Sequence, residues 1–459
     1  MKREFIELSL SEKEAERIAW ELFGIKGKAQ SLPGEIDMNF KIGVLDGNAY
    51  VLKVSRPETT VEYLQFQQEL LQHLETCDTE LEHPRAIADR DGLLVSAYEM
   101  NAGVRHVRLL SWVPGRMYSQ VNPQTDALRL SLGRVCGRIT SALQVFEHKE
   151  GHRRLDWDIA QGEWTVRHLE LFPSARSKTI RYFLNRFESH RQSYALLRKS
   201  MVHNDANDNN ILVSENLANP SVVTTIDFGD TIYTQIVNDL AVACAYAAMN
   251  LNDPLQGILP VIRGYHESFP LQEKELKYLY DCIAMRLIIS VTKSALNRLE
   301  EPDNEYLQIS DGQAWDLLEK WRAISPELAY YSFRAACGYK SHPNYESFLS
   351  WSQNSTFTLK ELFPTGPGDD AVDIDLSVGS TWLGLKEDFA DFGFFDFKIG
   401  ELQKANPKKV IAGGYLEARG VYATDSYDKL GNSGKESRTV HLGVDFWLPA
   451  GTPVHALLD

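Results

Sequence analysis

Residues 201–213 of this chain read Met-Val-His-Asn-Asp-Ala-Asn-Asp-Asn-Asn-Ile-Leu-Val, a His-x-Asp-x-x-x-x-Asn motif that runs into a short apolar strand. A second apolar stretch, Val222–Ile226, leads directly into an Asp-Phe-Gly triplet that begins at Asp227. If the two stretches pair as a hairpin, Asp205 and Asn210 lie before its first strand and Asp227 lies at the end of its second. This arrangement indicates phosphoryl transfer. One carboxylate accepts the proton of a hydroxyl, while an amide oxygen and a second carboxylate hold Mg²⁺ on the nucleotide phosphates.

Each half of this pattern alone has an ordinary explanation, an Asn/Asp-rich turn or an unrelated Asp-Phe-Gly triplet. Together, the His-Asn-Asp-x-x-x-x-Asn and Ile-Asp-Phe-Gly-Asp segments resemble the aminoglycoside phosphotransferase and choline kinase superfamily, over about residues 1–350. The resemblance implies an α+β, two-lobed protein-kinase-like fold with a small β-rich N-lobe and a large helical C-lobe. It also implies ATP or GTP as phosphoryl donor, Asp205 as the catalytic base, and Asn210 and Asp227 as Mg²⁺ ligands.

The segment Ala49–Val54 is predicted to be a strand that carries Lys53 between apolar neighbours. The resemblance gives this lysine the role of holding the α- and β-phosphates of the nucleotide. The alternative is a lysine on the solvent face of an edge strand. A kinase lysine usually pairs with a glutamate of the following helix, which is predicted here over residues 60–75. Glu69 is the first candidate for this cofactor-binding role and Glu62 is the second.

Three further segments of the N-terminal part fit the same fold. A capping box that begins at Ser11 predicts a helix ending at Gly24. Residues 31–41 stand where a nucleotide-covering hairpin belongs. Residues 107–115 form an apolar strand that ends in Pro-Gly and resembles the interlobe linker, whose backbone binds the purine. The alternative is an ordinary buried strand before a turn. Backbone recognition leaves no side-chain pattern, so ATP and GTP cannot be told apart.

Related kinases bind the amine end of their substrates with carboxylates and aromatic rings from a segment like the one that holds Asp156, Trp157, Asp158 and Glu163. The alternative for this segment is a surface loop that its tryptophans anchor to the core. Arg286 is a charge inside an apolar helical stretch. It is a candidate for binding a substrate carboxylate or for a structural ion pair.

Three residues around the motif are given other roles. His203 is interpreted as a packing and hydrogen-bonding residue rather than the base. Asp239, at the start of a predicted helix, corresponds to the residue that braces the catalytic loop in the superfamily. Asp230, just after the Asp-Phe-Gly triplet, is left without a definite role.

The composition is that of a globular protein, with 43% apolar and 24% charged residues. The formal net charge of −15 argues against a nucleic-acid partner or an anionic membrane surface. The N-terminus has no apolar signal core, and no apolar run reaches the length of a membrane span. Cysteines without metal-ligand spacing favour a reduced, cytoplasmic protein.

The composition changes near Asn354, where the kinase-like part is expected to end. Residues 363–370 are rich in Pro, Gly and Asp and are predicted to be a linker with turns. Short strands are expected beyond it, at residues 371–378, 394–399 and 410–411. This part is therefore predicted to be a separate domain with β-structure.

The end of the chain contains His-x-Gly-x-Asp, from His441 to Asp445, followed by Gly-Thr-Pro-Val-x-Ala. It resembles the lysostaphin/LytM-type zinc metallopeptidases, in which this His and Asp are two of the zinc ligands. Such a site requires a third ligand from a later His-x-His motif, and the chain ends at Asp459 before one occurs. We therefore expect an incomplete Zn²⁺ site, no peptidase activity from this chain, and further C-terminal domains in the full-length protein.

The expected organisation is an N-lobe at residues 1–110, a C-lobe with the catalytic loop at 111–352, and a linker with a truncated metallopeptidase-like β domain at 353–459. The expected function is a small-molecule kinase that phosphorylates the hydroxyl of an amino alcohol or of a hydroxylated amino acid such as 5-hydroxylysine. Choline, ethanolamine or an aminoglycoside is the alternative acceptor. A zinc metallopeptidase-like protein and a non-catalytic nucleotide-binding scaffold are the alternatives from other classes.

Overall fold

The computed structural model describes residues 10–34, 37–100, 103–300, 311–382, 384, 391–420, 425–437 and 439–457. The chain divides into two compact units, Met1–Ser341 and His342–Asp459. Within the described ranges, no helix combines the length and the apolarity that a membrane span needs.

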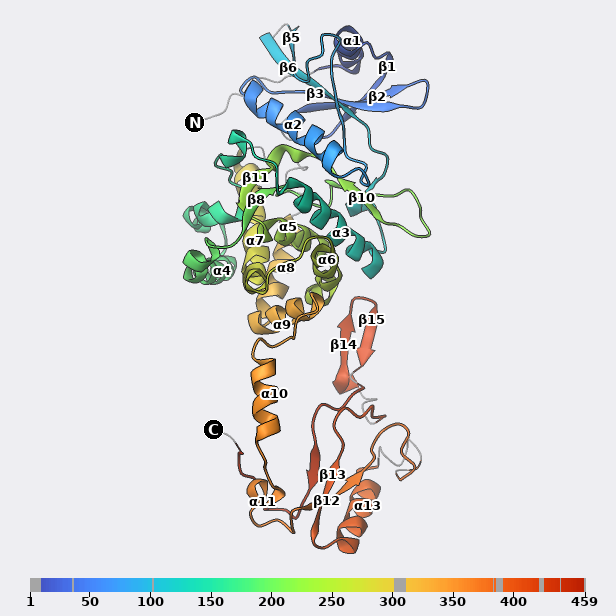
Figure 1. The fold of residues 1–459 in the computed structure, drawn as a ribbon, viewed down its shortest axis with the longest axis vertical. Helices are drawn as coiled ribbons and strands as arrows, with labels where there is room; N and C mark the ends of the chain where they lie inside the picture. Colours follow the sequence, from blue (N-terminus) through green and yellow to red (C-terminus); the bar gives the residue numbers. More distant parts are fainter. Residues whose placement is uncertain are drawn as a thin grey trace. The chain divides into compact units, whose positions relative to one another are not determined.

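The first part of the first unit is a small β-rich lobe (Figure 1). Its elements are α1 Glu12–Phe23, β1 Gly27–Leu32, β2 Met38–Val44, β3 Ala49–Val54, α2 Val61–Cys77, β4 Ala86–Ile87, β5 Ser96–Met100 and β6 Gly103–Ser111. The strands form an antiparallel sheet in the order β1-β2-β3-β6-β4, with β5 paired to β6. The sequence predictions are confirmed for the capping box at Ser11, the strand Ala49–Val54 and the helix after it.

The register of β3 and β6 decides which side chains leave the small-lobe core. Lys53 and Arg108 lie directly opposite each other across these two strands. Their strand neighbours Leu52 and Leu109 belong to the apolar core that the sheet forms with α1. Because successive side chains of a strand point to opposite faces, Lys53 and Arg108 share the face turned away from that core.

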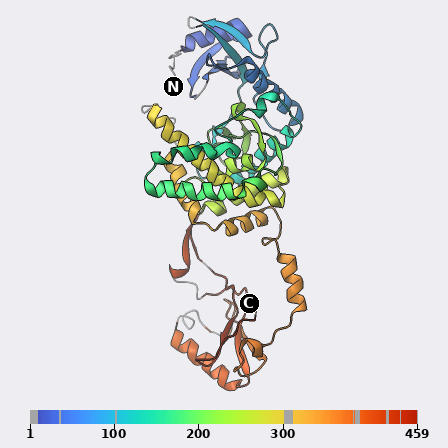
Figure 2. The ribbon, with the colours of Figure 1, turned by 90° about the vertical axis from the view of Figure 1, so that its left-hand side faces the viewer.

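The rest of the first unit is a mainly helical lobe that lies beyond the small-lobe sheet in both views (Figures 1 and 2). Its elements are β7 Arg116–Met117, η1 Tyr118–Gln120, α3 Asp126–Leu143, η2 Lys149–His152, η3 Ile159–Leu171, α4 Ser174–Tyr194, β8 Lys199–Val202, β9 Ile211–Val213, β10 Val222–Thr225, η4 Phe228–Asp230, β11 Ile232–Gln235, α5 Val237–Ala247, α6 Pro254–Ser268, α7 Glu273–Glu300, α8 Asp311–Ala323 and α9 Pro326–Ala336. Strands β9 and β10 pair antiparallel, which confirms the predicted hairpin before Asp227.

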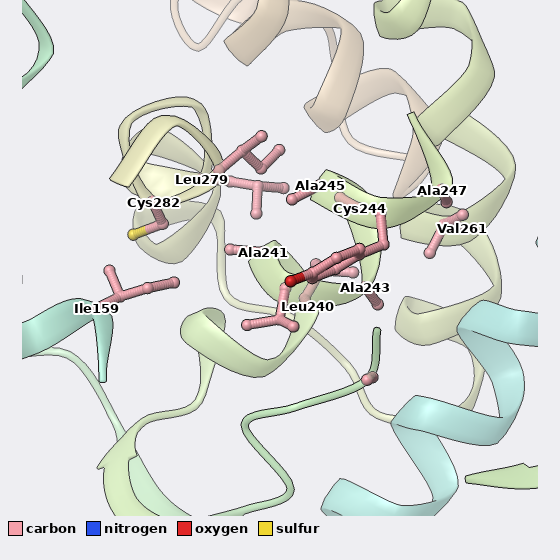
Figure 3. Close-up of a cluster of buried hydrophobic side chains, with 14 of the residues drawn as sticks. Ile159, Leu240, Ala241, Ala243, Cys244, Ala245, Ala247, Val261, Leu279 and Cys282 are labelled. Carbon is pink, nitrogen blue, oxygen red and sulfur yellow. The ribbon is translucent and has the colours of Figure 1, made fainter. Parts of the chain in front are cut away.

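Helix α5 lies in the large-lobe core, and every residue from Val237 to Ala247 is buried. Figure 3 shows its short apolar side chains next to Leu279 and Cys282 of α7. The many alanines of α5 let neighbouring helices approach closely, and this packing gives the helix a fixed position. Asp239, in the first turn of α5, is thereby held under the catalytic loop.

The second unit mixes helices and strands. Its elements are α10 Tyr345–Asn354, α11 Leu359–Leu362, β12 Asp370–Ile374, α13 Phe392–Ala405, β13 Lys409–Gly413, η6 Asp425–Tyr427, β14 Asp428–Gly431, β15 Gly434–Ser437 and β16 Asp445–Trp447. Strand β13 pairs parallel with β12 and antiparallel with β16.

The expectation of a strand at residues 394–399 is wrong, because these residues lie inside α13. Asp391 caps this helix and accepts a hydrogen bond from the Phe394 N–H (3.0 Å). Ile399 is buried in the small apolar cluster of this unit. A short apolar run fits a buried strand and a buried helix equally well, so periodicity alone did not decide between them.

Candidate active site

The catalytic loop is anchored beneath its first residues. The Asn204 N–H donates to Oδ1 of Asp239 (3.0 Å), and the Thr140 hydroxyl donates to Oδ2 of the same carboxylate (3.1 Å). His203 accepts a hydrogen bond from the Asp205 N–H at Nδ1 (3.2 Å), and its Nε2 contacts the Ile226 carbonyl (3.1 Å). The interpretation of Asp239 as a brace and of His203 as a hydrogen-bonding residue is confirmed.

The Asp205 carboxylate accepts hydrogen bonds at both oxygens. Oδ1 accepts from Nη2 of Arg286 (2.6 Å). Oδ2 accepts from the side-chain amides of Asn207 (2.9 Å) and Asn210 (2.7 Å). Burial raises the pKa of Asp205, and the charge of Arg286 opposes that shift. The carboxylate thus has a fixed orientation and a cationic partner.

Arg286 reaches this carboxylate from α7 and is only 1% exposed. Its guanidinium also donates to the Tyr246 hydroxyl (3.3 Å) and lies over the rings of Trp157 (4.6 Å) and Tyr246 (5.4 Å). Of the two roles open to Arg286 from the sequence, the ion pair is present, and its partner is Asp205.

Asn210 and Asp227 present oxygen atoms to the same site. The Asn210 amide nitrogen donates to Asp205, which turns the amide oxygen Oδ1 away from that bond. Asp227 has a φ of 60° and accepts at Oδ1 from the Gly229 N–H (3.3 Å). Lys53 lies 3.8 Å from Oδ2 of Asp227 and holds the pKa of Asp227 below its usual range.

This pair of oxygen donors fits Mg²⁺, which prefers oxygen ligands and takes one or two protein groups when phosphates and water supply the rest. Across the described ranges, no group of three or more His, Cys, Asp or Glu side chains could hold a metal ion by itself. Two protein oxygens suit a Mg²⁺ ion whose other ligands are phosphate oxygens and water.

Lys53 has aspartates rather than a helix glutamate around it. Besides Asp227, its amine lies 3.9 Å from Oδ2 of Asp37, whose carboxylate accepts from Arg108 (2.5 Å). Arg108 also donates to the side chain of Gln67 on α2 (2.6 Å). Lys53 and Asp227 thus come together as predicted, and Asp37 and Arg108 complete the cluster.

Glu69 does not take the predicted place beside Lys53. Its side chain is 54% exposed, and its carboxylate lies 3.7 Å from His148. Glu62 is exposed as well. The inward face of α2 carries Tyr63 and Gln67 instead. The helix is rotated about its axis so that Glu62 and Glu69 are exposed to solvent.

The turn after Asp227 is held from two sides. The Tyr63 hydroxyl donates to the Gly229 carbonyl (2.6 Å), and Arg153 donates to the carbonyls of Gly229 (2.8 Å) and Thr231 (2.7 Å). Asp230 lies between these two carbonyls. Burial and the charge of Asp205 raise the pKa of Asp230 to about 7.

The carboxylates of the polar-aromatic segment have partners within the protein. Asp156 pairs with Lys293 (2.7 Å), and Glu163 lies 3.7 Å from Arg191. Asp158 is 2% exposed and accepts from several donors, among them the Thr234 hydroxyl (2.9 Å). Trp157 contributes its ring to the pocket of Arg286.

In the second unit, the two zinc-ligand candidates lie close together. Nε2 of His441 is 3.4 Å from Oδ2 of Asp445. The same oxygen of Asp445 accepts from Nη1 of Arg419 (2.5 Å). The carboxylate that would bind Zn²⁺ is therefore engaged by a cation of the protein.

Residues 29–268 match the family described as the phosphotransferase enzyme family (APH). The chain belongs to this family. It is therefore a phosphotransferase that transfers a phosphoryl group to a hydroxyl acceptor.

Curated relatives of this phosphotransferase include the hydroxylysine kinases of Mus musculus and Bos taurus. The first is 25% identical over 334 residues, which cover 68% of this chain and 89% of the relative. The second is 26% identical over 343 residues, with the same shares of the two chains.

Solved structures with the same fold include a microcompartment-associated aminopropanol kinase, with a TM-score of 0.53, 17% identity, and coverage of 71% of this chain and 98% of that one. An amicoumacin kinase in complex with AMP-PNP and Ca²⁺ has a TM-score of 0.52 and 16% identity, over 68% of this chain and 94% of that one. These similarities show the two-lobed kinase fold.

We expect Arg286→Met to lower kcat strongly and to reduce the free energy of unfolding by about 3 kcal/mol, since it leaves a buried carboxylate without its cation. The matched control is Arg198→Met. It breaks the ion pair of Arg198 with Glu275 (2.7 Å), which lies on α7 like Arg286. Urea unfolding and steady-state kinetics at a temperature where all variants are folded provide the measurements. Equal losses of kcat in the two variants would show that the effect of Arg286 does not depend on its contact with Asp205.

Proposed function

We propose that this phosphotransferase transfers the γ-phosphoryl group of ATP or GTP to the hydroxyl of an amine-bearing alcohol, and that a hydroxylated amino acid such as 5-hydroxylysine is the acceptor. Two contacts carry the proposal: Lys53 of β3 lies 3.8 Å from Asp227, and Asn210 donates to Asp205 (2.7 Å) within the loop before β9. The charge of Asp227 also acts on the pKa of Asp205, which links the two pairs. The choice of acceptor follows the relatives named as hydroxylysine kinases, which include those of Danio rerio and Xenopus laevis.

In this proposal each residue has one task. Asp205 orients the acceptor hydroxyl and accepts its proton. Lys53 binds phosphate oxygens, and Asn210 Oδ1 and the Asp227 carboxylate hold Mg²⁺. The metal supplies neutralisation of the phosphate charge. Positioning and electrostatic stabilisation account for the rate, because phosphoryl transfer asks for little covalent participation by the protein.

The proposal assigns different roles to the segments of the chain. Residues 1–110 form the nucleotide-covering lobe and residues 111–352 form the lobe with the catalytic loop. We assign no role in phosphoryl transfer to residues 353–459. His441 and Asp445 in that segment stay candidates for an incomplete zinc site.

A panel of acceptors tests the proposal. The full chain is incubated with MgATP or MgGTP and with 5-hydroxylysine, ethanolamine, choline or an aminoglycoside, and nucleoside diphosphate release is followed in a coupled assay. We expect 5-hydroxylysine to give the highest kcat/KM. The proposed function would be refuted if no acceptor raised the rate of nucleoside diphosphate release above the rate of nucleotide hydrolysis without acceptor.

A further inference from the structure

Lys53 lies between two carboxylates that differ in exposure. Its amine is 3.9 Å from Oδ2 of Asp37 and 3.8 Å from Oδ2 of Asp227. The Asp37 side chain is 9% exposed, whereas that of Asp227 is 51% exposed. Asp227 is therefore open to a ligand from solution, and Asp37 is enclosed by the protein.

Arg108 anchors the Asp37 carboxylate. Nη2 of Arg108 donates to Oδ2 of Asp37 (2.5 Å), and Nη1 donates to the side chain of Gln67 on α2 (2.6 Å). Arg108 is 2% exposed and lies opposite Lys53 in the sheet. The same oxygen of Asp37 thus faces both cations, and charge-assisted hydrogen bonds of this kind are among the strong ones in proteins. The carboxylate therefore has a fixed place beside the Lys53 amine.

The backbone around Asp37 is also fixed. Asp37 directly precedes β2, and Asn39 is the second residue of that strand. The side-chain amide of Asn39 donates to the carbonyls of Pro33 (3.4 Å) and Asp37 (3.3 Å). A Cβ atom at Gly34 would lie 2.6 Å from the Asp37 carbonyl oxygen, so the loop needs glycine at this position. These contacts fix Asp37 within residues 31–41, which the sequence predicts to be the nucleotide-covering hairpin.

The glutamates of α2 do not supply the partner of the lysine. Glu62, Glu69 and Glu75 are all exposed to solvent. Gln67, which carries no charge, bonds to Arg108 on the inward face of the helix. In kinases of this general fold the carboxylate beside the lysine comes from this helix. In this chain a carboxylate from the loop before β2 stands beside the lysine instead.

We propose that Asp37 is a positioning residue for Lys53: it holds the amine toward the nucleotide phosphates and leaves Asp227 available to Mg²⁺. This inference rests on the proposed function, which assigns the phosphates to Lys53 and the metal to Asp227. Among the described carboxylates beside Lys53, Asp227 is the one that remains when Asp37 loses its charge. The amine then pairs with Asp227 alone, and a cation held there opposes the binding of a second cation at the same carboxylate.

The test removes the charge of Asp37 and measures the Mg²⁺ requirement of nucleotide binding. Asp37→Asn keeps the size of the side chain, and the amide oxygen can still accept from Arg108. ATP binding to the full chain is titrated by calorimetry at a series of Mg²⁺ concentrations, without an acceptor. We expect the Mg²⁺ concentration for half-maximal ATP binding to rise at least about fivefold, because an exposed ion pair contributes up to about that factor and the Lys53–Asp37 pair is mostly buried. Saturating Mg²⁺ should reduce the difference from the wild type.

Two variants are the matched controls. Asp37→Glu keeps the charge and should keep a Mg²⁺ requirement close to that of the wild type. Asp46→Asn removes a charge from the turn between β2 and β3, where the carboxylate accepts from the Asn48 N–H (2.9 Å), and should not change the requirement. The requirement is a property of the folded molecules, so a variant of lower stability still gives a decisive value.

An unchanged Mg²⁺ requirement in Asp37→Asn would overturn the inference. An equal rise in Asp37→Asn and Asp37→Glu would also overturn it, since the shape of the loop rather than the charge of Asp37 would then be responsible. The binding measurement needs no acceptor, so it tests Asp37 separately from the panel of acceptors. A wild type that binds no MgATP or MgGTP would refute the proposed function itself.

Discussion

Asp205→Asn should lower kcat by about 10²- to 10⁴-fold while the Kd for MgATP stays nearly unchanged. The amide keeps the shape of the side chain but cannot accept the hydroxyl proton. Lys53 and Asp227, to which we assign the phosphates and the metal, have no hydrogen bond with the Asp205 side chain among the described contacts. The loss should therefore appear in turnover and not in nucleotide affinity, as measured by steady-state kinetics and calorimetric titration.

Asp208→Asn is the control for this variant. Asp208 lies in the same loop, and its backbone carbonyl accepts from the Ser119 N–H (3.0 Å). We expect its kcat to stay within about threefold of the wild type, as for a substitution that leaves the reacting group in place. Equal turnover in Asp205→Asn and the wild type would remove Asp205 from the role of base.

Asp227→Asn should lower kcat by about a thousandfold and raise the Mg²⁺ concentration needed for half-maximal activity. Metal-ion stabilisation of the transition state contributes several kcal/mol. Each roughly 1.4 kcal/mol of activation free energy changes the rate tenfold. The substitution also removes the negative charge that faces Lys53 at 3.8 Å. Activity measured across a Mg²⁺ titration separates the metal effect from a general loss.

Glu69→Gln serves as the control for Asp227→Asn. Glu69 contacts His148 rather than Lys53, so its loss should change neither kcat nor the Mg²⁺ requirement. If Glu69→Gln had the larger effect of the two, the glutamate would be the functional partner of Lys53, and the arrangement around the lysine described above would be incorrect.

The parts of the site that sequence reasoning found are those with a local signature. The hairpin β9–β10, the strand of Lys53 and the cap at Ser11 depend on residues within a few positions of one another. Alternation and capping preferences act over such distances, so they could be seen in the sequence. Asp205, Asn210 and Asp227 could be assigned to one candidate site from the sequence because the hairpin joins them.

The parts that sequence reasoning missed depend on contacts between distant segments. Arg286 and Asp205 are 81 residues apart, and Arg108 and Asp37 are 71 apart. A charge inside an apolar stretch marked Arg286, and Arg108 carries the same signal between Val107 and Leu109. Neither signal predicts which carboxylate the arginine will pair with. The choice of Glu69 failed because the rotation of α2 follows from packing against the large lobe, which its sequence does not disclose.

The most direct test of the central claim is a crystal structure of the protein with Mg²⁺ and the non-hydrolysable ATP analogue AMP-PNP. The account predicts one metal in contact with Oδ1 of Asn210 and the carboxylate of Asp227, the amine of Lys53 on a phosphate oxygen, and Asp205 facing the γ-phosphate without binding the metal. A nucleotide bound elsewhere, or a metal that touches neither Asn210 nor Asp227, would contradict it.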